Sequence, residues 1–444
     1  MKVLLILESA VEKSMYINVL PPLGILGIAS YLISKRIDTK VIDCNIEDYN
    51  YENIEKYDVI GFSLFCSNIT KTFNAAKKIK NKFPNKKVII GGPHTLTNPE
   101  EFIKKDYIDA VFIGESEHSL YEFLTSKDLT NIQGVYFKEN NKIKFNGLHP
   151  FLTDLDSLPF PALDQVKLEK YVFPISKAQP ISQIMTSRGC PYSCIYCFHS
   201  LGKKWRARSA KNIVDEIEWQ VNKLGVKEIS ISDDNFTLDR KRVEEVCDII
   251  IKRKIKVKIQ LMNGIRADKV DKELLKKMKK AGTWLIAVAP ETGNEETLLK
   301  IKKGMSLECS KNVVKWCKEL RISTYAFYMV GFPWETEKHI NKTIDFAEKL
   351  DTDFTQFSRV LPFEGTELAK MLCAKTDTKN DIGLFYGNNK YSEQKLSDEQ
   401  TKKLIQKAYK RCYFKPFKML RILKILSLKN LYLLAKYAFK TESM

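Results

Sequence analysis

The chain of 444 residues lacks any long apolar run. No stretch approaches the roughly twenty apolar residues that a membrane-spanning helix needs. The apolar start of the chain is too short for a secretory signal and ends at Glu8. Seven of the ten cysteines are scattered among apolar or helical surroundings, which is typical of a reducing compartment. We therefore expect a cytoplasmic protein.

Acidic residues are absent from 401–441, where twelve Lys or Arg account for most of the net charge of +19. Nucleic-acid-binding proteins usually spread basic residues over a groove-facing patch, so we expect no nucleic acid partner. A capping box at 397–400 predicts the start of a helix, followed by an apolar stripe at Leu404, Ala408 and Cys412. Such basic amphipathic segments either dock on the protein body or lie on anionic membranes. Docking is the favoured interpretation, and peripheral membrane contact is the alternative.

Residues 1–140 alternate strand and helix signals. Strands are predicted at 3–7, 40–43, 59–65, 87–90 and 110–113, and helices at 23–33, at 70–83 and from Asn98. This alternation is typical of a doubly wound, Rossmann-like α/β sheet, which binds ligands beyond the carboxyl ends of its strands. Gly24, Gly91, Gly92 and Gly114 fall at such ends, where glycine lets a ligand approach the backbone. Taken singly, each is also explained as an ordinary turn glycine.

The rest of the chain divides into three parts. Residues 141–180 are broken repeatedly by Pro and Asp and are predicted to be a linker. Residues 181–370 contain six strand–helix units, with strands at 183–186, 227–232, 256–262, 284–289, 324–330 and 354–361. Polar or Gly-Pro motifs follow each strand, which predicts a partial (β/α)6, TIM-like barrel with its chemistry at that end. Residues 371–444 are predicted to be a basic, helical C-terminal region.

Three cysteines lie close together at the end of the first barrel strand. Cys190, Cys194 and Cys197 have C-x3-C-x2-C spacing, short enough for one loop to surround a metal centre. Thiolates bind zinc and iron–sulfur clusters. A four-iron cluster normally takes four thiolates, so three would leave one iron open. His199 could instead complete a Cys3His zinc site, which would make the chain a zinc-stabilised binding module.

This loop resembles the cluster loop of radical S-adenosylmethionine (SAM) enzymes, with Tyr196 in the place of the motif's aromatic residue. The resemblance implies a [4Fe-4S] cluster on the three cysteines, whose open iron chelates SAM and cleaves it to a 5′-deoxyadenosyl radical. D-D-N-F at 233–236, P-E-T-G at 290–293 and G-F-P-W-E-T at 331–336 resemble further motifs of the family. Glu291 is expected to meet the ribose or the amino group of SAM. The residues that the resemblance assigns to SAM are Tyr196, Asp233, Asp234, Glu291, Gly331, Phe332 and Pro333.

The N-terminal half resembles the cobalamin (B12)-binding domain that precedes many radical SAM barrels. The matching strings are P-P-L-G at 21–24, G-G-P-H at 91–94 and G-E-S-E at 114–117. The residues that this resemblance assigns to cobalamin are Leu23, Gly24, Ser63, Gly91, Gly92, His94, Gly114 and Glu115. The D-x-H-x-x-G string that places a histidine beneath cobalt is absent from the sequence, so we expect no histidine at that position.

Together these resemblances imply a cobalamin-dependent radical SAM enzyme similar to the class B methyltransferases. Such an enzyme methylates an unactivated carbon through methylcobalamin. Ring closure, rearrangement or oxidation with the same cofactors remains the alternative. A methylthiotransferase would need three N-terminal cysteines, and only Cys44 and Cys66 are available. The expected partners are a small-molecule or lipid-like substrate and an external electron donor such as flavodoxin or ferredoxin. Beyond the cofactor ligands, no catalytic residue is identified. Arg266 and Asp268 are expected to form an ion pair.

Overall fold

The computed structural model describes residues 1–10, 19–140, 142–372, 395–426 and 430. They form two compact units. Among the described residues, the first comprises those of Met1–Val172 with Ser200–Gly202, and the second comprises Phe173–His199 and those from Lys203 onward. The division falls within the predicted linker. Much of the predicted C-terminal region, including 373–394 and 431–444, lies outside the described residues.

The first unit is built on a seven-stranded sheet of order β2-β1-β3-β4-β5-β6-β7. The first five strands are parallel, as predicted for a doubly wound fold. The chain order reverses between β1 and β3, and the crevice at such a switch point is where ligands bind. The parallel strands are β1 Lys2–Leu7, β2 Asp38–Asp43, β3 Val59–Ser63, β4 Lys87–Gly91 and β5 Ala110–Phe112.

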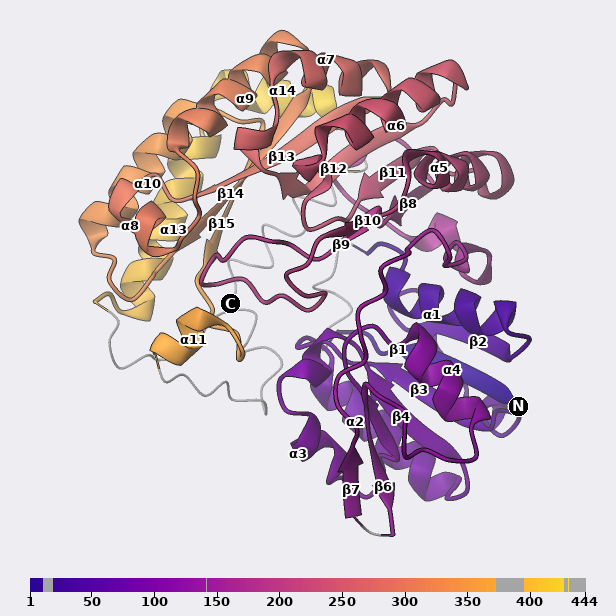
Figure 1. The fold of residues 1–444 in the computed structure, drawn as a ribbon. Helices are drawn as coiled ribbons and strands as arrows, with labels where there is room; N and C mark the ends of the chain where they lie inside the picture. The colour runs from indigo at the N-terminus through magenta and orange to yellow at the C-terminus, as the bar shows by residue number, and fades with distance from the viewer. Residues whose placement is uncertain (11–18, 141, 373–394, 427–429, 431–444) are drawn as a thin grey trace. The chain divides into compact units, whose positions relative to one another are not determined.

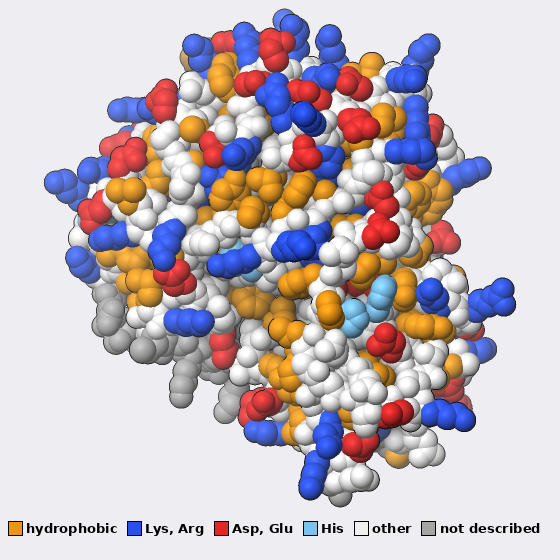
Figure 2. All heavy atoms as spheres, in the orientation of Figure 1, with side chains coloured by type: hydrophobic (Ala, Val, Ile, Leu, Met, Phe, Trp, Pro, Cys, Tyr) orange, Lys and Arg blue, Asp and Glu red, His pale blue; other side chains and the backbone are white. Residues whose placement is uncertain are grey.

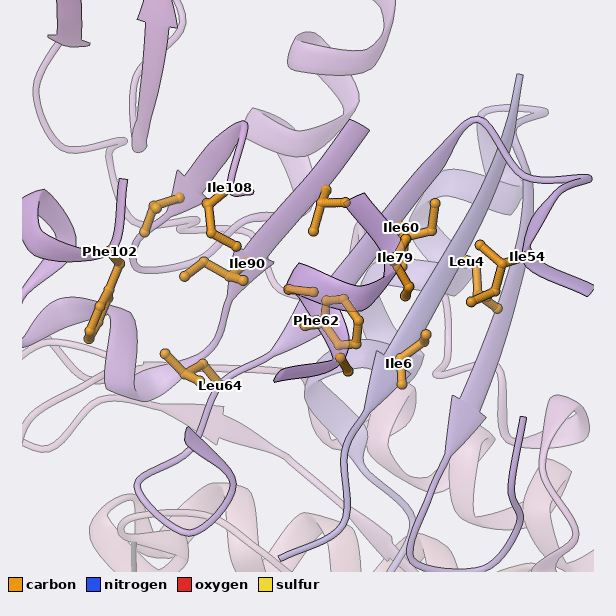
Figure 3. Close-up of a cluster of buried hydrophobic side chains, with 14 of the residues drawn as sticks. Leu4, Ile6, Ile54, Ile60, Phe62, Leu64, Ile79, Ile90, Phe102 and Ile108 are labelled. Atoms are coloured by element: carbon orange, nitrogen blue, oxygen red, sulfur yellow. The ribbon is translucent and has the colours of Figure 1, made fainter. Parts of the chain in front are cut away.

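Helices cover both faces of this sheet. They are α1 Leu23–Ser34, α2 Ile69–Lys82, α3 Pro99–Ile103 and α4 Glu117–Thr125. Alternate strand residues such as Leu4, Ile60 and Phe62 form one core with Ile79 of α2 and Phe102 of α3 (Figure 3). The strands are buried on both sides, which explains their continuous apolar runs.

Two elements of the first unit have no counterpart among the predicted strands. β6 Val135–Glu139 and β7 Lys142–Phe145 form an antiparallel hairpin on the edge of the sheet beside β5. β7 is exposed along its whole length, and its alternation of Lys with Ile143 and Phe145 spans only four residues, the shortest pattern that indicates a strand.

Part of the predicted linker packs on the first unit. The Ala162 amide donates to the carbonyl of Leu26 in α1, and the Gln165 side chain bonds to the backbone of Thr39 and Val41 along β2. The Tyr171 hydroxyl is buried and donates to Asp43 at 3.0 Å. The segment therefore follows one edge of the first sheet up to the point where the second unit begins.

The second unit contains a six-stranded parallel sheet of order β15-β14-β13-β12-β11-β8. Its strands follow the chain order, as predicted for a partial barrel, and helices lie along their outer side (Figure 1). The strands are β8 Ile181–Ile184, β11 Glu228–Ile231, β12 Lys258–Ile265, β13 Thr283–Glu291, β14 Ser323–Val330 and β15 Phe354–Arg359. The helices between them are α5 Ala210–Leu224, α6 Arg240–Lys252, α7 Lys272–Lys280, α8 Glu295–Lys300, α9 Leu307–Glu319 and α10 Glu337–Leu350.

Within the described residues, three further helices follow β15: α11 Glu367–Met371, α13 Asp398–Tyr413 and α14 Pro416–Ile425. The capping box at the start of α13 is confirmed, since Ser397 and Gln400 exchange side-chain-to-backbone hydrogen bonds. The predicted stripe of Leu404, Ala408 and Cys412 is buried, so α13 docks on the body. None of the helices in the described part of the chain is long and apolar enough to cross a bilayer.

Candidate functional site at the carboxyl ends of the barrel strands

The cysteine loop follows the first barrel strand and is anchored on both sides. At its base, β9 Ser187–Arg188 pairs with β10 Arg206–Ala207. Further along, the Ile195 amide donates to the carbonyl of Ile301 at 3.2 Å, and the Leu368 amide donates to the carbonyl of Ile195 at 2.9 Å. The Ile195 side chain is buried in a small core with Phe332 and Leu368. The loop is therefore held against the carboxyl-terminal side of the barrel.

The three thiols differ in exposure. Cys194 is buried, Cys190 is partly buried and Cys197 is exposed. A hydrogen bond from the Cys197 thiol lowers the pKa of Cys194 to about 6, and the Lys303 ammonium acts in the same direction. A thiol with a lowered pKa is a good metal ligand, because the thiolate is the form that binds. No three His, Cys, Asp or Glu side chains within the described ranges are already gathered at metal-binding distance.

His199 does not join these thiols in a set of four. Its Nε2 lies 2.9 Å from the carbonyl oxygen of Tyr192, so the ring bonds to the backbone of the loop itself. This contact gives His199 a structural role within the loop, which weakens the zinc interpretation.

Glu291 ends β13 and lies beside the cysteine loop. Its Oε1 accepts hydrogen bonds from the Tyr196 hydroxyl at 2.9 Å and from Lys303 Nζ at 2.8 Å. The side chains of Lys303 and Glu291 are only 12% and 9% exposed. Glu291 also has a φ of +67°, which is costly for a residue with a side chain and is characteristic of functional sites. Lys303 carried no signal in the sequence, because it lies in a turn between two helices.

Arg266 links the end of β12 to the same region. It pairs with Asp268 through two bonds of 2.9 and 3.2 Å, so the expected ion pair is present. It also donates to the carbonyls of Lys303 and Gly304, each at 3.0 Å. Its guanidinium lies 3.6 Å from the ring centroid of Tyr192 in the cysteine loop. Arg266 therefore fixes the backbone that carries Lys303 relative to the loop.

Asp233 is engaged by the protein itself. Its carboxylate accepts bonds from the Thr186 amide and hydroxyl, both at 2.5 Å, and from the Ser187 hydroxyl at 2.6 Å. Arg242 lies 3.7 Å away, and Asp233 is 1% exposed. This geometry favours a role in holding the start of the cysteine loop. Asp234 has an exposed side chain and accepts a bond from the Gly189 amide at the edge of the loop.

The turn at 331–335 follows β14 and packs beneath Tyr196. The buried carboxylate of Glu335 accepts bonds from the amides of Gly331 and Phe332 at 2.9 and 3.1 Å. Burial raises the pKa of Glu335 to about 7. The Phe332 ring contacts Tyr196 edge-on and stacks on Trp334. Trp334, which replaces a glycine of the family motif, therefore supports this aromatic stack.

In the first unit, the ends of β3 and β4 lie side by side. Ser63 and Gly91 are register partners, and the Leu64 amide donates to the carbonyl of Gly91 at 2.7 Å. Gly92 has a φ of +104°, and a Cβ there would lie 2.8 Å from the backbone N and O of Leu64. Packing of the two loops therefore requires glycine at 92. A Cβ at Gly91 would meet only ordinary contact distances, the nearest being 3.6 Å.

Two side chains that sequence reasoning missed join the ends of these strands. The Thr95 hydroxyl lies 2.8 Å from the carbonyl of Gly92 and 2.6 Å from that of Phe112 on β5. Asn68 donates to the carbonyls of Glu8 and Ser63, which connects β1 to β3. Ser, Thr and Asn are common in any loop, so only the fold distinguishes these residues.

The other residues assigned to cobalamin differ in whether they border open space or contact the protein. Leu23 and Gly24 begin α1, and a Cβ at Gly24 or Gly114 would meet no atom within 4 Å, so both glycines border open space. His94 is different, because its Nε2 is buried without a partner among the described residues and burial lowers its pKa to about 4. Glu115 accepts a bond from the Leu152 amide at 2.9 Å.

Comparisons with known proteins match both halves of the chain. Residues 184–347 match the family model of the radical SAM superfamily, and residues 16–124 match that of the B12 binding domain. An uncharacterized methyltransferase of Pyrococcus horikoshii is 31% identical over 94% of this chain and 93% of its own length. The chain belongs to the radical SAM superfamily. It carries a B12-binding domain ahead of its radical SAM domain.

Further relatives of this radical SAM protein differ in the reaction they are named for. A cytidylyl-2-hydroxyethylphosphonate methyltransferase of Streptomyces wedmorensis is 25% identical, covering 79% of this chain and 77% of its own length. An anaerobic magnesium-protoporphyrin IX monomethyl ester cyclase of Rubrivivax gelatinosus is also 25% identical, covering 80% and 67%. In fold, the chain resembles the radical SAM methyltransferase TsrM of Kitasatospora setae, with a TM-score of 0.69, 17% identity and coverage of 84% and 74%.

The cofactors of this radical SAM enzyme are a [4Fe-4S] cluster, SAM and cobalamin. The residues present fit them. Three thiols on one anchored loop match a cluster that keeps an open iron. Glu291 supplies a charged acceptor beside the loop, suited to ribose hydroxyls or an ammonium group. Gly24 at the start of α1 and Gly114 after β5 border open space and suit close approach by a large planar ligand.

Proposed function

We propose that this enzyme transfers a methyl group from methylcobalamin to an unactivated carbon of a small-molecule or lipid-like substrate. The observation that carries the proposal is the anchored loop of Cys190, Cys194 and Cys197 beside Glu291, on a chain that also contains a B12-binding domain. When bound, the cluster with SAM supplies a 5′-deoxyadenosyl radical and cobalamin supplies the methyl group. The protein's task is to position these groups and to exclude water.

In this proposal the three cysteines bind the cluster and Glu291 binds SAM. Oε1 of Glu291 is engaged by Tyr196 and Lys303, and no described residue donates to Oε2. Oε2 is therefore available to accept bonds from the ribose hydroxyls or the amino group of SAM. Tyr196 and Lys303 act as positioning residues that fix the carboxylate.

The backbone at 331–333 completes the SAM site in this proposal. Its shape depends on the two amide bonds to Glu335 and on the stacking of Phe332 with Tyr196. Asp234 lies at the edge of the cysteine loop and is also a proposed contact of SAM. Asp233 instead holds the start of that loop and makes no direct contact with SAM.

For cobalamin, the proposed contacts are Leu23, Gly24, Ser63, Gly91 and Gly114, with Glu115 at the edge. Gly92, Thr95 and Asn68 hold the strand ends that present them. The His94 ring packs near Phe102, at 5.8 Å between centroids, so we assign it to the support of this loop instead of to the ligand.

The experiment that tests this function supplies SAM labelled with deuterium in its methyl group to the anaerobically reconstituted enzyme with a strong reductant. We expect 5′-deoxyadenosine and a product that carries the labelled methyl group, detected by mass spectrometry. The Cys194→Ala variant is expected to lose the cluster and all SAM cleavage, whereas Cys309→Ala, on α9 and outside the C-x3-C-x2-C loop, retains both. Formation of 5′-deoxyadenosine by Cys194→Ala would refute the ligand assignment.

Ring closure, rearrangement or oxidation is a second candidate, favoured by the similarity to the anaerobic cyclase. It uses the same cofactors, so 5′-deoxyadenosine would still form. The product would then lack the label. Its mass would fall by the loss of hydrogen on ring closure, change by a loss of hydrogen or a gain of oxygen on oxidation, or stay that of the substrate after a rearrangement. An external one-electron donor such as flavodoxin or ferredoxin is needed in either case and stays a prediction.

A further inference from the structure

Helix α14 presents its apolar side chains to the outside of the molecule. Met419, Leu420 and Leu423 are about half exposed, and Phe417 is 84% exposed. Phe414, in the short connection from α13, is also 84% exposed. At 100° per residue, Phe417, Leu420, Met419 and Leu423 share one side of the helix. We call Phe414, Phe417, Met419, Leu420 and Leu423 the α14 apolar face. Within that arc the only charged residue is Lys424.

The opposite side of α14 carries cations that face the protein. Lys418 is 2% exposed and lies over the Tyr413 ring, and Arg421 bonds to Asp351 at 2.8 and 2.9 Å and to Asp353 at 3.2 Å. Lys415, just before the helix, pairs with Glu348 at 3.3 Å. The charges on this side are therefore matched by acids at the end of α10 and the start of β15.

This arrangement reverses the usual polarity of a surface helix, which buries its apolar side and keeps its cations in water. Ion pairs hold α14 in place while its largest apolar groups remain in solvent. A contiguous exposed apolar patch of this kind marks an interaction surface. The helix is ten residues long, too short to span a bilayer but suited to lie in its interface.

The positive charge of the segment 401–441 indicates which kind of partner the α14 apolar face binds. No acidic residue occurs from 401 to 441, so the apolar face lies in a basic segment of a chain with net charge +19. The exposed side of α13 adds Lys402, Lys403 and Lys410 nearby in sequence. A second copy of the chain would bring two such basic regions together, which like charges oppose. An anionic lipid surface attracts them and accepts the Phe and Leu side chains.

We propose that the α14 apolar face inserts into the interface of an anionic membrane and holds the enzyme at the membrane surface. The two phenylalanines at its start are the deepest anchors because they are the most exposed. The inference does not rest on the proposed reaction, since it concerns a helix outside the cofactor sites.

The test measures co-sedimentation of the full-length, anaerobically reconstituted enzyme with vesicles. One set contains phosphatidylcholine alone, and the other contains about one third phosphatidylglycerol. We expect binding to the anionic vesicles, weakened by high salt because screening removes the electrostatic attraction. The triple variant Phe414→Ser/Phe417→Ser/Leu420→Ser should bind roughly tenfold less or weaker still.

Leu299→Ser is the matched control, because Leu299 is 79% exposed but lies on α8. It should bind vesicles as the wild type does. Both variants should keep the wild-type melting temperature and 5′-deoxyadenosine formation, which shows that they are folded. Failure of the wild type to bind anionic vesicles, or unchanged binding by the triple variant, would overturn the proposal. So would light scattering that shows a wild-type dimer broken by the triple variant.

Discussion

At the scale of residues, the site depends on one buried charge pair. Glu291 and Lys303 meet at 2.8 Å with little exposure, and both also contact the Tyr196 hydroxyl. Breaking a buried pair by removing one partner leaves the other charge uncompensated and typically costs about 3 kcal/mol or more. A substitution at Glu291 therefore acts on stability as well as on ligand binding, and the two effects need separate measurements.

For Glu291→Gln we expect SAM affinity to fall by about tenfold, because a charged acceptor is replaced by a neutral one. The spectrum of the cluster without SAM should stay as in the wild type. The melting temperature should also drop, because Lys303 is left unpaired. Glu291→Gln/Lys303→Met should recover the melting temperature but not the affinity. The control is Glu296→Gln, because Glu296 is an exposed carboxylate on α8. Unchanged SAM affinity in Glu291→Gln would show that Glu291 does not bind SAM.

The adjacent glycines at 91 and 92 should respond differently to alanine. Gly92→Ala places a Cβ 2.8 Å from the Leu64 backbone at a positive φ, so the first unit should lose stability. Gly91→Ala meets only ordinary contacts, so the fold should persist while cobalamin content falls severalfold. The measurements are melting temperature and the absorbance of bound cobalamin. Full cobalamin loading in a stable Gly91→Ala variant would remove Gly91 from the binding site.

At the scale of elements, α13 protects the edge of the barrel sheet. β15 is the last strand, and its outer backbone groups bond to two tyrosines one turn apart on α13. The Tyr413 hydroxyl bonds to the amide and carbonyl of Thr355, at 2.7 and 2.9 Å. The Tyr409 hydroxyl bonds likewise to Phe357, at 3.2 and 3.3 Å. Exposed strand edges promote aggregation, and these contacts cover part of this one.

Replacing both tyrosines by phenylalanine should expose this edge. Tyr409→Phe/Tyr413→Phe leaves two amides and two carbonyls without their partners, at about 1 kcal/mol or more for each lost bond. We expect hydrogen exchange at the Thr355 and Phe357 amides to become at least roughly tenfold faster. Amides in the middle of β14 serve as the internal reference. Equal protection in the variant and the wild type would show that the hydroxyls do not stabilise the edge.

The turn after β14 should make stability depend on pH. Burial raises the pKa of Glu335 from 4.5 to about 7, so the folded state binds its proton more tightly than the unfolded state does. Glu335 therefore stabilises the fold less as the pH rises from about 4.5 to about 7, by up to about 1.4 kcal/mol per pH unit.

Glu335→Gln removes this titration while keeping an acceptor for the amides of Gly331 and Phe332. Its melting temperature should therefore fall less than that of the wild type between about pH 5 and pH 8. Glu337→Gln, at an exposed carboxylate two residues along, should keep the wild-type profile. Parallel profiles for Glu335→Gln and the wild type would contradict the assignment.

At the scale of the whole molecule, the residues proposed for each cofactor lie on a different unit, with its own sheet and core. We therefore predict independent loading. Cys194→Ala should lose iron and sulfide but keep cobalamin, and Gly91→Ala should lose cobalamin but keep iron and sulfide. Elemental analysis and absorbance spectroscopy of the purified variants test this. Loss of both cofactors in either folded variant would show that the sites are coupled.

Charge is also distributed unevenly over the whole molecule. On the face drawn in Figure 2, basic and acidic side chains are interspersed instead of forming one large basic field. The described residues also form exposed ion pairs, such as Lys211 with Asp215 and Lys300 with Glu296, which contribute little to stability. Most of the excess positive charge of the sequence lies instead toward the C-terminus, where acids are absent from 401 to 441. This distribution supports the membrane proposal for α14.

The sequence alone determined the fold class and the position of the metal loop. Parallel strands buried on both faces leave continuous apolar runs, and the order of these runs predicted both sheets. The hairpin of β6 and β7 was not predicted, because the alternating pattern of β7 spans only four residues and both of its faces are exposed to solvent. Cys190, Cys194 and Cys197 could be recognised because their donors come from one short segment, so spacing alone carries the information.

Only the tertiary structure decided which partners those residues have. Lys303 and Thr95 lie outside the recognised motifs and gain their roles from contacts with Glu291 and Phe112. Glu335 lies within the string at 331–336, but only the fold shows that its carboxylate is buried against the amides of Gly331 and Phe332. Asp233 and Gly92 were assigned to ligand sites from the sequence, and the fold adds that Asp233 bonds to Thr186 and Ser187 and that Gly92 packs against the Leu64 backbone. The sequence also did not determine which side of α14 faces solvent. An amphipathic sequence specifies two faces, and the acids of α10 and β15 determine which of the two docks on the protein.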